Sequence, residues 1–187
     1  MSVHHCVWPL TIATTAAVAG CVDTTPVAPS SERAAQVVTT PQAAASVEFN
    51  TTIAELRRVT ARYHDLAVAE ADGFVRITPD CEEREGEVPV AIVYGHLGRV
   101  LDGVLDPSLP DGLLYEPGDE DRLKLVGVEM VLPYPLWASA EPPRFLGVPL
   151  QREDEFGVFG LHIWIWRHSP NRLFSVDNPR VSCDAAQ

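Results

Sequence analysis

The chain has 187 residues, 46% of them hydrophobic, which suits one ordinary globular domain with additional tails. It carries 14 Lys and Arg against 26 Asp and Glu, giving a formal net charge of −12 at pH 7. Such a chain repels phosphate backbones, and it contains no cluster of basic residues, so we expect no nucleic-acid partner.

The N-terminus is predicted to be a cleavable export signal, residues 1–20. Its apolar part, residues 7–20, is shorter than the roughly 20 residues that cross a bilayer, and it ends in small residues. The segment Val18-Ala19-Gly20-Cys21 resembles the lipobox of bacterial lipoproteins. The resemblance implies cleavage before Cys21 and attachment of diacylglyceryl and palmitate chains at Cys21; an ordinary secretory signal is the alternative.

This resemblance also implies where the protein lies. We expect an exported protein tethered to a membrane, facing the periplasm or the cell surface, with the outer membrane favoured because Val22 and not Asp follows Cys21. Residues 21–50 then hold the lipidated Cys and a flexible linker, because they are rich in Thr, Pro, Ala and Ser. The globular domain is predicted over residues 51–187.

The domain is predicted to begin with a helix over 53–72. Thr52-Ile53-Ala54-Glu55 matches a capping box, apolar residues follow at helical spacing, and Gly73 offers a stop. Strands are predicted downstream, over 74–78, 88–94, 112–116, 122–132 and 158–167. Because helices and strands do not alternate, we predict an α+β fold, with one N-terminal helix packed on an antiparallel sheet of about five strands. A small open β-barrel is the alternative.

The positions of the four cysteines predict different roles for them. Cys6 lies in the signal and Cys21 is the lipid site, which leaves Cys81 and Cys183 in an oxidising compartment. We predict a disulfide between these two; free thiols or pairing with another chain are the alternatives.

The last predicted strand holds the best candidate site. Alternation places Leu161, Ile163 and Ile165 on one face of the strand, and His162, Trp164, Trp166 and His168 on the other. Two Trp rings beside a His offer apolar area and hydrogen-bond donors to a ligand. Ordinary sheet packing of the two Trp side chains is the alternative.

A transition metal at His162 would need ligands from other elements. His168 cannot share the ion, because six residues of a strand span about 20 Å. We expect the further ligands among Glu129 in the fourth strand, His96 after the second and His64 on the helix, since imidazole and carboxylate are usual ligands of such metals. The alternative for His162 is a buried imidazole bonded to the backbone.

The sequence lacks several common catalytic and nucleotide-binding motifs. It has no Gly-x-Ser-x-Gly, P-loop, Gly-x-Gly-x-x-Gly, His-Glu-x-x-His or Cys-x-x-Cys motif, so no nucleotide enzyme or standard serine hydrolase is supported. The acidic runs 82–87 and 119–121 lack the glycine-punctuated rhythm of a calcium loop, and we expect them to be solvated.

Short motifs spread over most of 60–183 resemble an uncharacterised family of exported bacterial proteins. They are Tyr63-His64-Asp65, Ala71-Asp72-Gly73-Phe74, Cys81, Leu114-Tyr115-Glu116-Pro117, Leu125-Val126-Gly127-Val128-Glu129, Leu161-His162-Ile163-Trp164-Ile165-Trp166 and Asn178-Pro179-Arg180-Val181-Ser182-Cys183. The resemblance implies no activity, but it implies that Glu129 and His162 are typical features of the group.

The function expected from these observations is binding of a small ligand or a transition metal by a membrane-tethered domain. The pocket would contain His162, Trp164, Trp166 and Glu129, with His96 or His64. The alternative is an envelope protein-interaction or structural module that presents an exposed aromatic sheet face. An enzyme that uses Glu129 and His162 as acid and base is a third hypothesis, although nothing in the sequence marks a nucleophile.

Overall fold

A computed structural model describes residues 41–78, 81 and 91–183 of the chain. The predicted signal 1–20, the lipid site Cys21, residues 22–40 of the predicted linker and the acidic run 82–87 lie outside the described residues. Within the described part of the chain, no helix combines the length and the apolar character that crossing a membrane requires.

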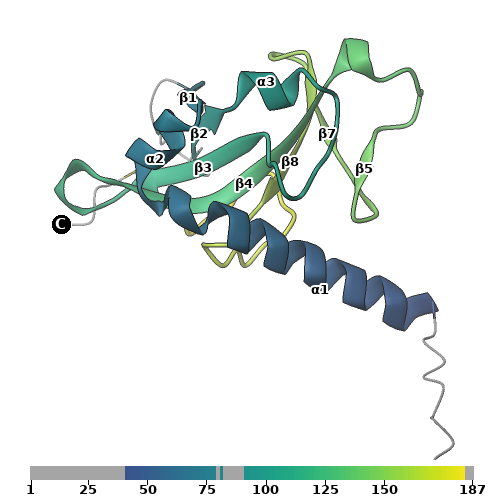
Figure 1. The fold of residues 1–187 in the computed structure, drawn as a ribbon, viewed down its shortest axis with the longest axis horizontal. Helices are drawn as coiled ribbons and strands as arrows, with labels where there is room; N and C mark the ends of the chain where they lie inside the picture. Colours follow the sequence, from purple (N-terminus) through teal and green to yellow (C-terminus); the bar gives the residue numbers. More distant parts are fainter. Residues whose placement is uncertain (1–40, 79–80, 82–90, 184–187) are drawn as a thin grey trace, which may run out of the picture. The chain divides into compact units, whose positions relative to one another are not determined.

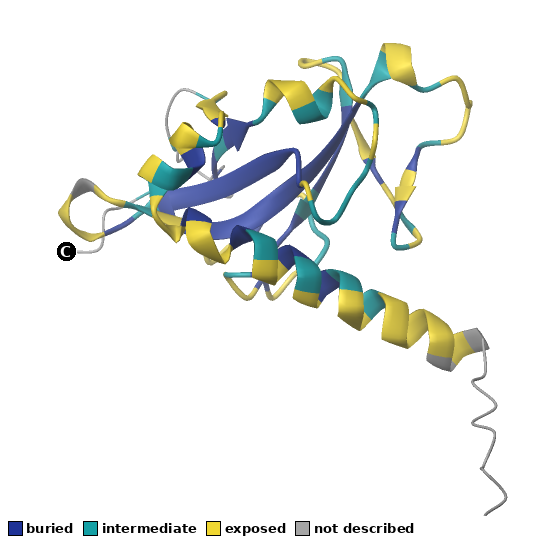
Figure 2. Cartoon of the chain, in the orientation of Figure 1, coloured by how far each residue is buried: buried dark blue, intermediate teal, exposed yellow. Residues whose placement is uncertain are grey.

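The N-terminal helical region starts earlier and is less regular than predicted. It consists of α1 (Pro41–Thr60), the 3-10 turn η1 (Ala61–His64) and α2 (Leu66–Ala71). The predicted start at Ile53 is wrong, and residues 41–50 of the predicted linker are helical. Pro suits the first turn of a helix and the alanines that follow favour helix, but the first turns of α1 are exposed (Figure 2), so no apolar periodicity marks them.

The predicted helix stop at Gly73 is confirmed. Gly73 has φ of 99°, a left-handed conformation that glycine adopts at low cost. The preceding helix α2 begins at a cap, because the Asp65 carboxylate accepts a hydrogen bond from the Ala67 amide at 3.0 Å. The chain therefore turns twice between α1 and the sheet.

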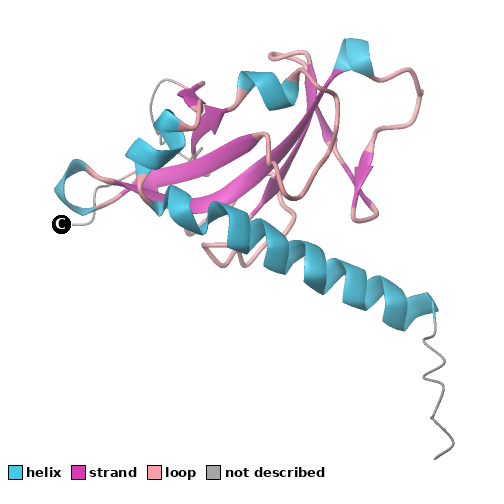
Figure 3. Ribbon diagram, in the orientation of Figure 1, coloured by secondary structure: helices cyan, strands magenta, loops and turns pink. Residues whose placement is uncertain are grey.

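One open sheet of six antiparallel strands forms the centre of the domain, in the order β1-β2-β3-β4-β8-β7 (Figures 1 and 3). The predicted α+β architecture is thus confirmed, and the barrel alternative is not observed in the described residues. The strands are β1 (Val75–Arg76), β2 (Ile92–Gly95), β3 (Gly112–Pro117), β4 (Leu123–Pro133), β7 (Gln151–Glu153) and β8 (Val158–Ile163).

Shorter elements connect the strands. The helix α3 (Leu97–Val100) follows β2, and the 3-10 turns η2 (Asp119–Asp121) and η3 (Tyr134–Leu136) follow β3 and β4. The strands β5 (Arg144–Phe145) and β6 (Val148–Pro149) form a separate two-stranded sheet.

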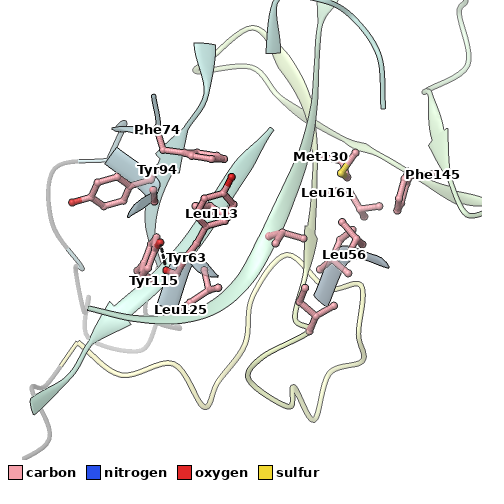
Figure 4. Close-up of a cluster of buried hydrophobic side chains, with 14 of the residues drawn as sticks. Leu56, Tyr63, Phe74, Tyr94, Leu113, Tyr115, Leu125, Met130, Phe145 and Leu161 are labelled. Carbon is pink, nitrogen blue, oxygen red and sulfur yellow. Dashed lines mark hydrogen bonds between the residues drawn. The ribbon is translucent and has the colours of Figure 1, made fainter. Parts of the chain in front are cut away.

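The face of the sheet next to α1 carries the main hydrophobic core (Figures 1 and 4). Leu56 of α1 and Leu113 and Met130 of the sheet are completely buried there. The hydroxyl of Tyr115 donates a hydrogen bond to the carbonyl of Tyr63 at 2.7 Å, which ties the sheet to η1 (Figure 4). Large apolar side chains therefore fill this face.

The opposite face has a smaller core at one end. It contains Leu114, Val126 and Trp164, covered by Val181 from the C-terminal segment. The predicted disulfide between Cys81 and Cys183 is confirmed, with 5.2 Å between the two Cα atoms. It ties the C-terminal segment, residues 168–183, to the chain just after β1.

Candidate metal centre

A row of four residues crosses the middle of the sheet on the face away from the main core. The strand register pairs Gly95 with Gly112, Gly112 with Glu129, and Glu129 with His162. Because two of the four positions are glycines, no side chain rises from β2 or β3 within this row. A cavity of about 370 Å³ lies there, within the size range of small-molecule sites.

The cavity wall is mostly apolar. Its ionisable side chains are Asp111, Glu129, Glu153 and His162, with Arg152 at the edge. The apolar wall includes Ile77, Val93, Leu97, Val131, Val158 and Val176.

Three of these ionisable groups, Glu129, Glu153 and His162, converge from three neighbouring strands, and we call them the triad. Each can offer one ligand atom, and the three atoms lie within 4.8 Å of one another. His162 Nε2 is 3.6 Å from Glu129 Oε1, so the expected proximity of these two residues is observed. A metal ion bound at about 2.0–2.2 Å from N and O ligands fits between such groups after small side-chain adjustments.

Glycine at position 160 makes the third ligand available. The short edge strand β7 pairs with β8, placing Gln151 opposite Gly160. A Cβ atom on Gly160 would overlap the Glu153 carboxylate and would lie 3.0 Å from Glu129 Oε1. Any side chain at position 160 would therefore displace Glu153 from the triad.

Glu129 is packed against a second glycine. A Cβ atom on Gly112 would lie 2.9 Å from the Cβ and 3.0 Å from the Oε2 of Glu129. Glycine here lets the carboxylate of Glu129 lie close to β3.

The imidazole of His162 is held by the C-terminal segment. Its Nδ1 lies 2.6 Å from the carbonyl oxygen of Val176. A carbonyl only accepts, so Nδ1 carries a proton, and in the neutral ring Nε2 presents its lone pair toward Glu129. A backbone carbonyl on the second ring nitrogen is a usual way to orient a metal-binding His.

Two groups of the triad have raised pKa values in the metal-free protein. Burial raises the pKa of Glu153 to about 7, and the negative charge of Glu129 adds to this effect. For His162, burial lowers the pKa, but the opposing effects of Glu129, the Val176 carbonyl and Glu153 outweigh it and leave the pKa raised. A divalent cation would therefore displace protons as it binds.

The structure does not bring His64, His96 or Trp166 to the triad. His64 stacks edge-on against Trp166, with ring centroids 4.5 Å apart, and Trp166 Nε1 donates to Thr60 Oγ1 at 3.1 Å. Both lie on the α1 side of the sheet. His96 caps α3, and its Nδ1 accepts a hydrogen bond from the Arg99 amide at 3.3 Å.

The prediction that Trp166 shares a face with His162 is wrong because the strand ends early. β8 stops at Ile163, and the amide of Trp166 donates to the Val126 carbonyl at 3.1 Å outside the ladder of paired strands. Alternation therefore does not continue past Ile165, and His168 is exposed.

Trp164 does lie on the predicted face, but it packs in the smaller core and does not line the cavity. It is 4% exposed, and its Nε1 donates to the Ser175 carbonyl at 2.8 Å. Its ring stands edge-on to His162, with centroids 5.6 Å apart. Trp164 therefore supports the His162 ring from the side.

Sequence reasoning missed Glu153 and Asp111. Glu153 stands in the polar run Gln151-Arg152-Glu153-Asp154-Glu155, which has the composition of an exposed loop. Gly160 was the available signal, because a glycine inside an otherwise apolar strand marks a close approach by another group.

Comparison with known proteins gives no match to any family model, curated protein or solved structure. Function must therefore be argued from the chemistry of the cavity.

Proposed function

We propose that this protein binds one divalent transition-metal ion through His162, Glu129 and Glu153. The observation that carries the proposal is the convergence of the three side chains at the floor of a cavity. Two carboxylates and a neutral imidazole neutralise a divalent ion and match the ligand preferences of zinc, iron and manganese.

The proposed setting is an exported, lipid-anchored domain. The lipobox ending at Cys21 supports export and the anchor, and the disulfide between Cys81 and Cys183 is typical of an oxidising compartment. In such a setting the C-terminal segment stays covalently tied while its Val176 carbonyl orients His162.

The interaction-module alternative draws no support from the two Trp side chains on which it was based. Trp164 is buried, and Trp166 is half-buried against Thr60 and His64. Neither presents an exposed aromatic sheet face to a partner.

The test is calorimetric titration of Zn²⁺ and Mn²⁺ into metal-free protein purified without a His tag. We expect one ion per chain for the wild type. Glu153→Gln should weaken affinity by at least about 100-fold, since second-sphere partners alone contribute 10–100-fold.

The matched control is Glu155→Gln, which removes an exposed carboxylate from the turn directly after β7 and should leave affinity unchanged. Absence of stoichiometric binding, or equal affinity in the Glu153 and Glu155 variants, would refute the proposal.

A further inference from the structure

The triad offers three ligand atoms, one fewer than a zinc ion takes. In the described part of the chain, no fourth His, Cys, Asp or Glu side chain joins the group. Zinc in proteins is almost always bound by four ligands, and a protein that provides three of them leaves the fourth position to water or to a bound molecule. A molecule that enters the cavity can therefore become a ligand of the ion.

The triad is within reach of such a molecule. Its three side chains all line the cavity. The side chain of His162 is 16% exposed and that of Glu129 is 7% exposed, and Glu153 is half-buried. Asp111 also lines the cavity wall, but it is completely buried and not accessible to a ligand. Contact between a ligand and the polar end of the cavity is therefore made at the triad.

The charges around the triad favour a neutral ligand. A divalent ion together with the carboxylates of Glu129 and Glu153 and the neutral imidazole of His162 carries no net charge. Among the described residues that line the cavity there is no Lys, and the single Arg, Arg152, pairs with Asp154 at 2.9 Å. An anionic ligand would therefore bring an unbalanced charge into a mostly apolar cavity, which is costly.

Apolar side chains surround the cavity and remain exposed. They come from four separate segments: Ile77 after β1, Leu97 on α3, Phe156 before β8 and Val176 in the C-terminal segment. Their exposed fractions are 48–62%. Exposed apolar side chains gathered around a cavity with a few polar groups are typical of a site for a largely apolar molecule.

We propose that the ion on the triad binds, as its further ligand, a neutral nitrogen atom at one end of a small hydrocarbon molecule. Imidazole-like nitrogen is the neutral donor that suits these metals, whereas a thiol binds them as an anion. The hydrocarbon body lies against the apolar wall, which includes Leu97, Val131 and Val158. The inference rests on the proposed metal site and adds the class of molecule that this site takes.

The experiment compares 1-butylimidazole with three molecules that each lack one of its properties. 1-Methylimidazole lacks the hydrocarbon body, 1-butylpyrrole lacks the donor nitrogen, and hexanoate replaces the neutral donor by an anion. Each is titrated at pH 8, where an imidazole ring is largely neutral, into the full chain with one equivalent of Zn²⁺ and into the metal-free chain. NMR shifts of amides lining the cavity measure affinity. The visible absorption of the Co²⁺-loaded chain shows whether the nitrogen coordinates the ion.

We expect 1-butylimidazole to bind the Zn²⁺-loaded chain at least about 10-fold more tightly than each of the other three molecules. One buried CH₂ group contributes about 4-fold to affinity, so the three additional carbons of the butyl group give this factor even when they are incompletely buried. In the metal-free chain, the preference over 1-butylpyrrole should be lost, because the nitrogen then has no ion to coordinate.

Leu97→Ser tests the apolar wall. Leu97 is an exposed side chain of α3, so the fold should tolerate the change, as thermal unfolding will show. The affinity for 1-butylimidazole should fall by about 3–10-fold, and the affinity for Zn²⁺ should not change. The matched control is Leu101→Ser, which removes a similarly exposed leucine directly after the same helix, outside the cavity lining, and should change neither affinity.

Several outcomes would overturn the inference and leave the metal site intact. They are hexanoate binding as tightly as 1-butylimidazole, no gain from the butyl group, no change in the absorption of the Co²⁺-loaded chain, and equal losses in the two leucine variants. The comparison of the four molecules uses the wild type, so it does not depend on the folding of a variant. Failure of Zn²⁺ to bind would instead overturn the proposed function, and the inference with it.

Discussion

The two faces of the sheet are built from alternating residues of the same strands, and they differ sharply. In β4, Val128, Met130 and Leu132 point to the main core under α1, while Glu129 and Val131 point to the cavity. The first face is filled by large apolar side chains from the helical region. The second face has glycines at the centre and carboxyl groups around them.

The two faces of the sheet therefore have different roles: one stabilises the fold, and the other holds the candidate metal site. The face next to α1, which we call the covered face, buries apolar area, and this burial favours folding. The cavity face keeps three carboxyl groups and an imidazole close together, which opposes folding until a cation arrives. Neighbouring residues of one strand can therefore have opposite effects on the free energy of unfolding.

The largest expected effect comes from the covered face. Met130→Ala removes a completely buried side chain and should lower the free energy of unfolding by about 2–5 kcal/mol. Denaturant unfolding monitored by circular dichroism measures this loss. Zn²⁺ should still bind stoichiometrically to the folded variant, although Met130 is next to Glu129 in the sequence. If folded Met130→Ala protein did not bind Zn²⁺, the two faces of the sheet would not have separate roles.

A smaller effect is expected from Gly160→Ala on the cavity face. The added methyl group displaces the Glu153 carboxylate, so Zn²⁺ affinity should fall by about 10–100-fold. Gly157→Ala is the comparison variant, because nothing lies near the added atom but its φ of 69° is strained for alanine. Gly157→Ala should lose stability and keep its affinity; the same loss of affinity in both variants would count against the geometry of the triad.

The smallest expected effect is a dependence of stability on pH. Because the folded pKa of Glu153 is about 7, above its ordinary value of 4.5, its contribution to the stability of the metal-free protein is full below about pH 4.5 and is lost as pH rises through 7. Asp111 acts in the same direction. Glu153→Gln should therefore be more stable than the metal-free wild type at pH 8, by an amount of the order of 1 kcal/mol.

Thermal unfolding at pH 5 and pH 8 measures this difference. Addition of Zn²⁺ should reverse the order at pH 8, since the wild type binds the ion more tightly and gains more stability from it. A Glu153→Gln variant that is less stable than the metal-free wild type at pH 8 would show that Glu153 stabilises the fold without a metal.

Local patterns were enough for the architecture and for two of the three triad residues. The stop at Gly73, the long strand β4 and the alternation around His162 follow from short-range geometry, in which side chains repeat at fixed intervals. The disulfide followed from the number of cysteines left in the predicted mature chain.

Where local pattern and packing disagree, prediction from sequence failed. Residues 41–50 are helical although they bury little, so no apolar periodicity marks them. Trp166 leaves the predicted face because the chain ends its pairing at Ile163, an event that depends on contacts with Val126 and the C-terminal segment.

The sequence by itself determined an α+β domain and singled out one imidazole and one carboxylate, His162 and Glu129, as candidate ligands. Only the tertiary structure decided that Glu153 completes the triad and that one oxygen of Asp111 has no donor among the described residues. The physical reason is that a three-residue edge strand has no register of its own: it is placed by packing over Gly160, a contact between strands that no local pattern encodes.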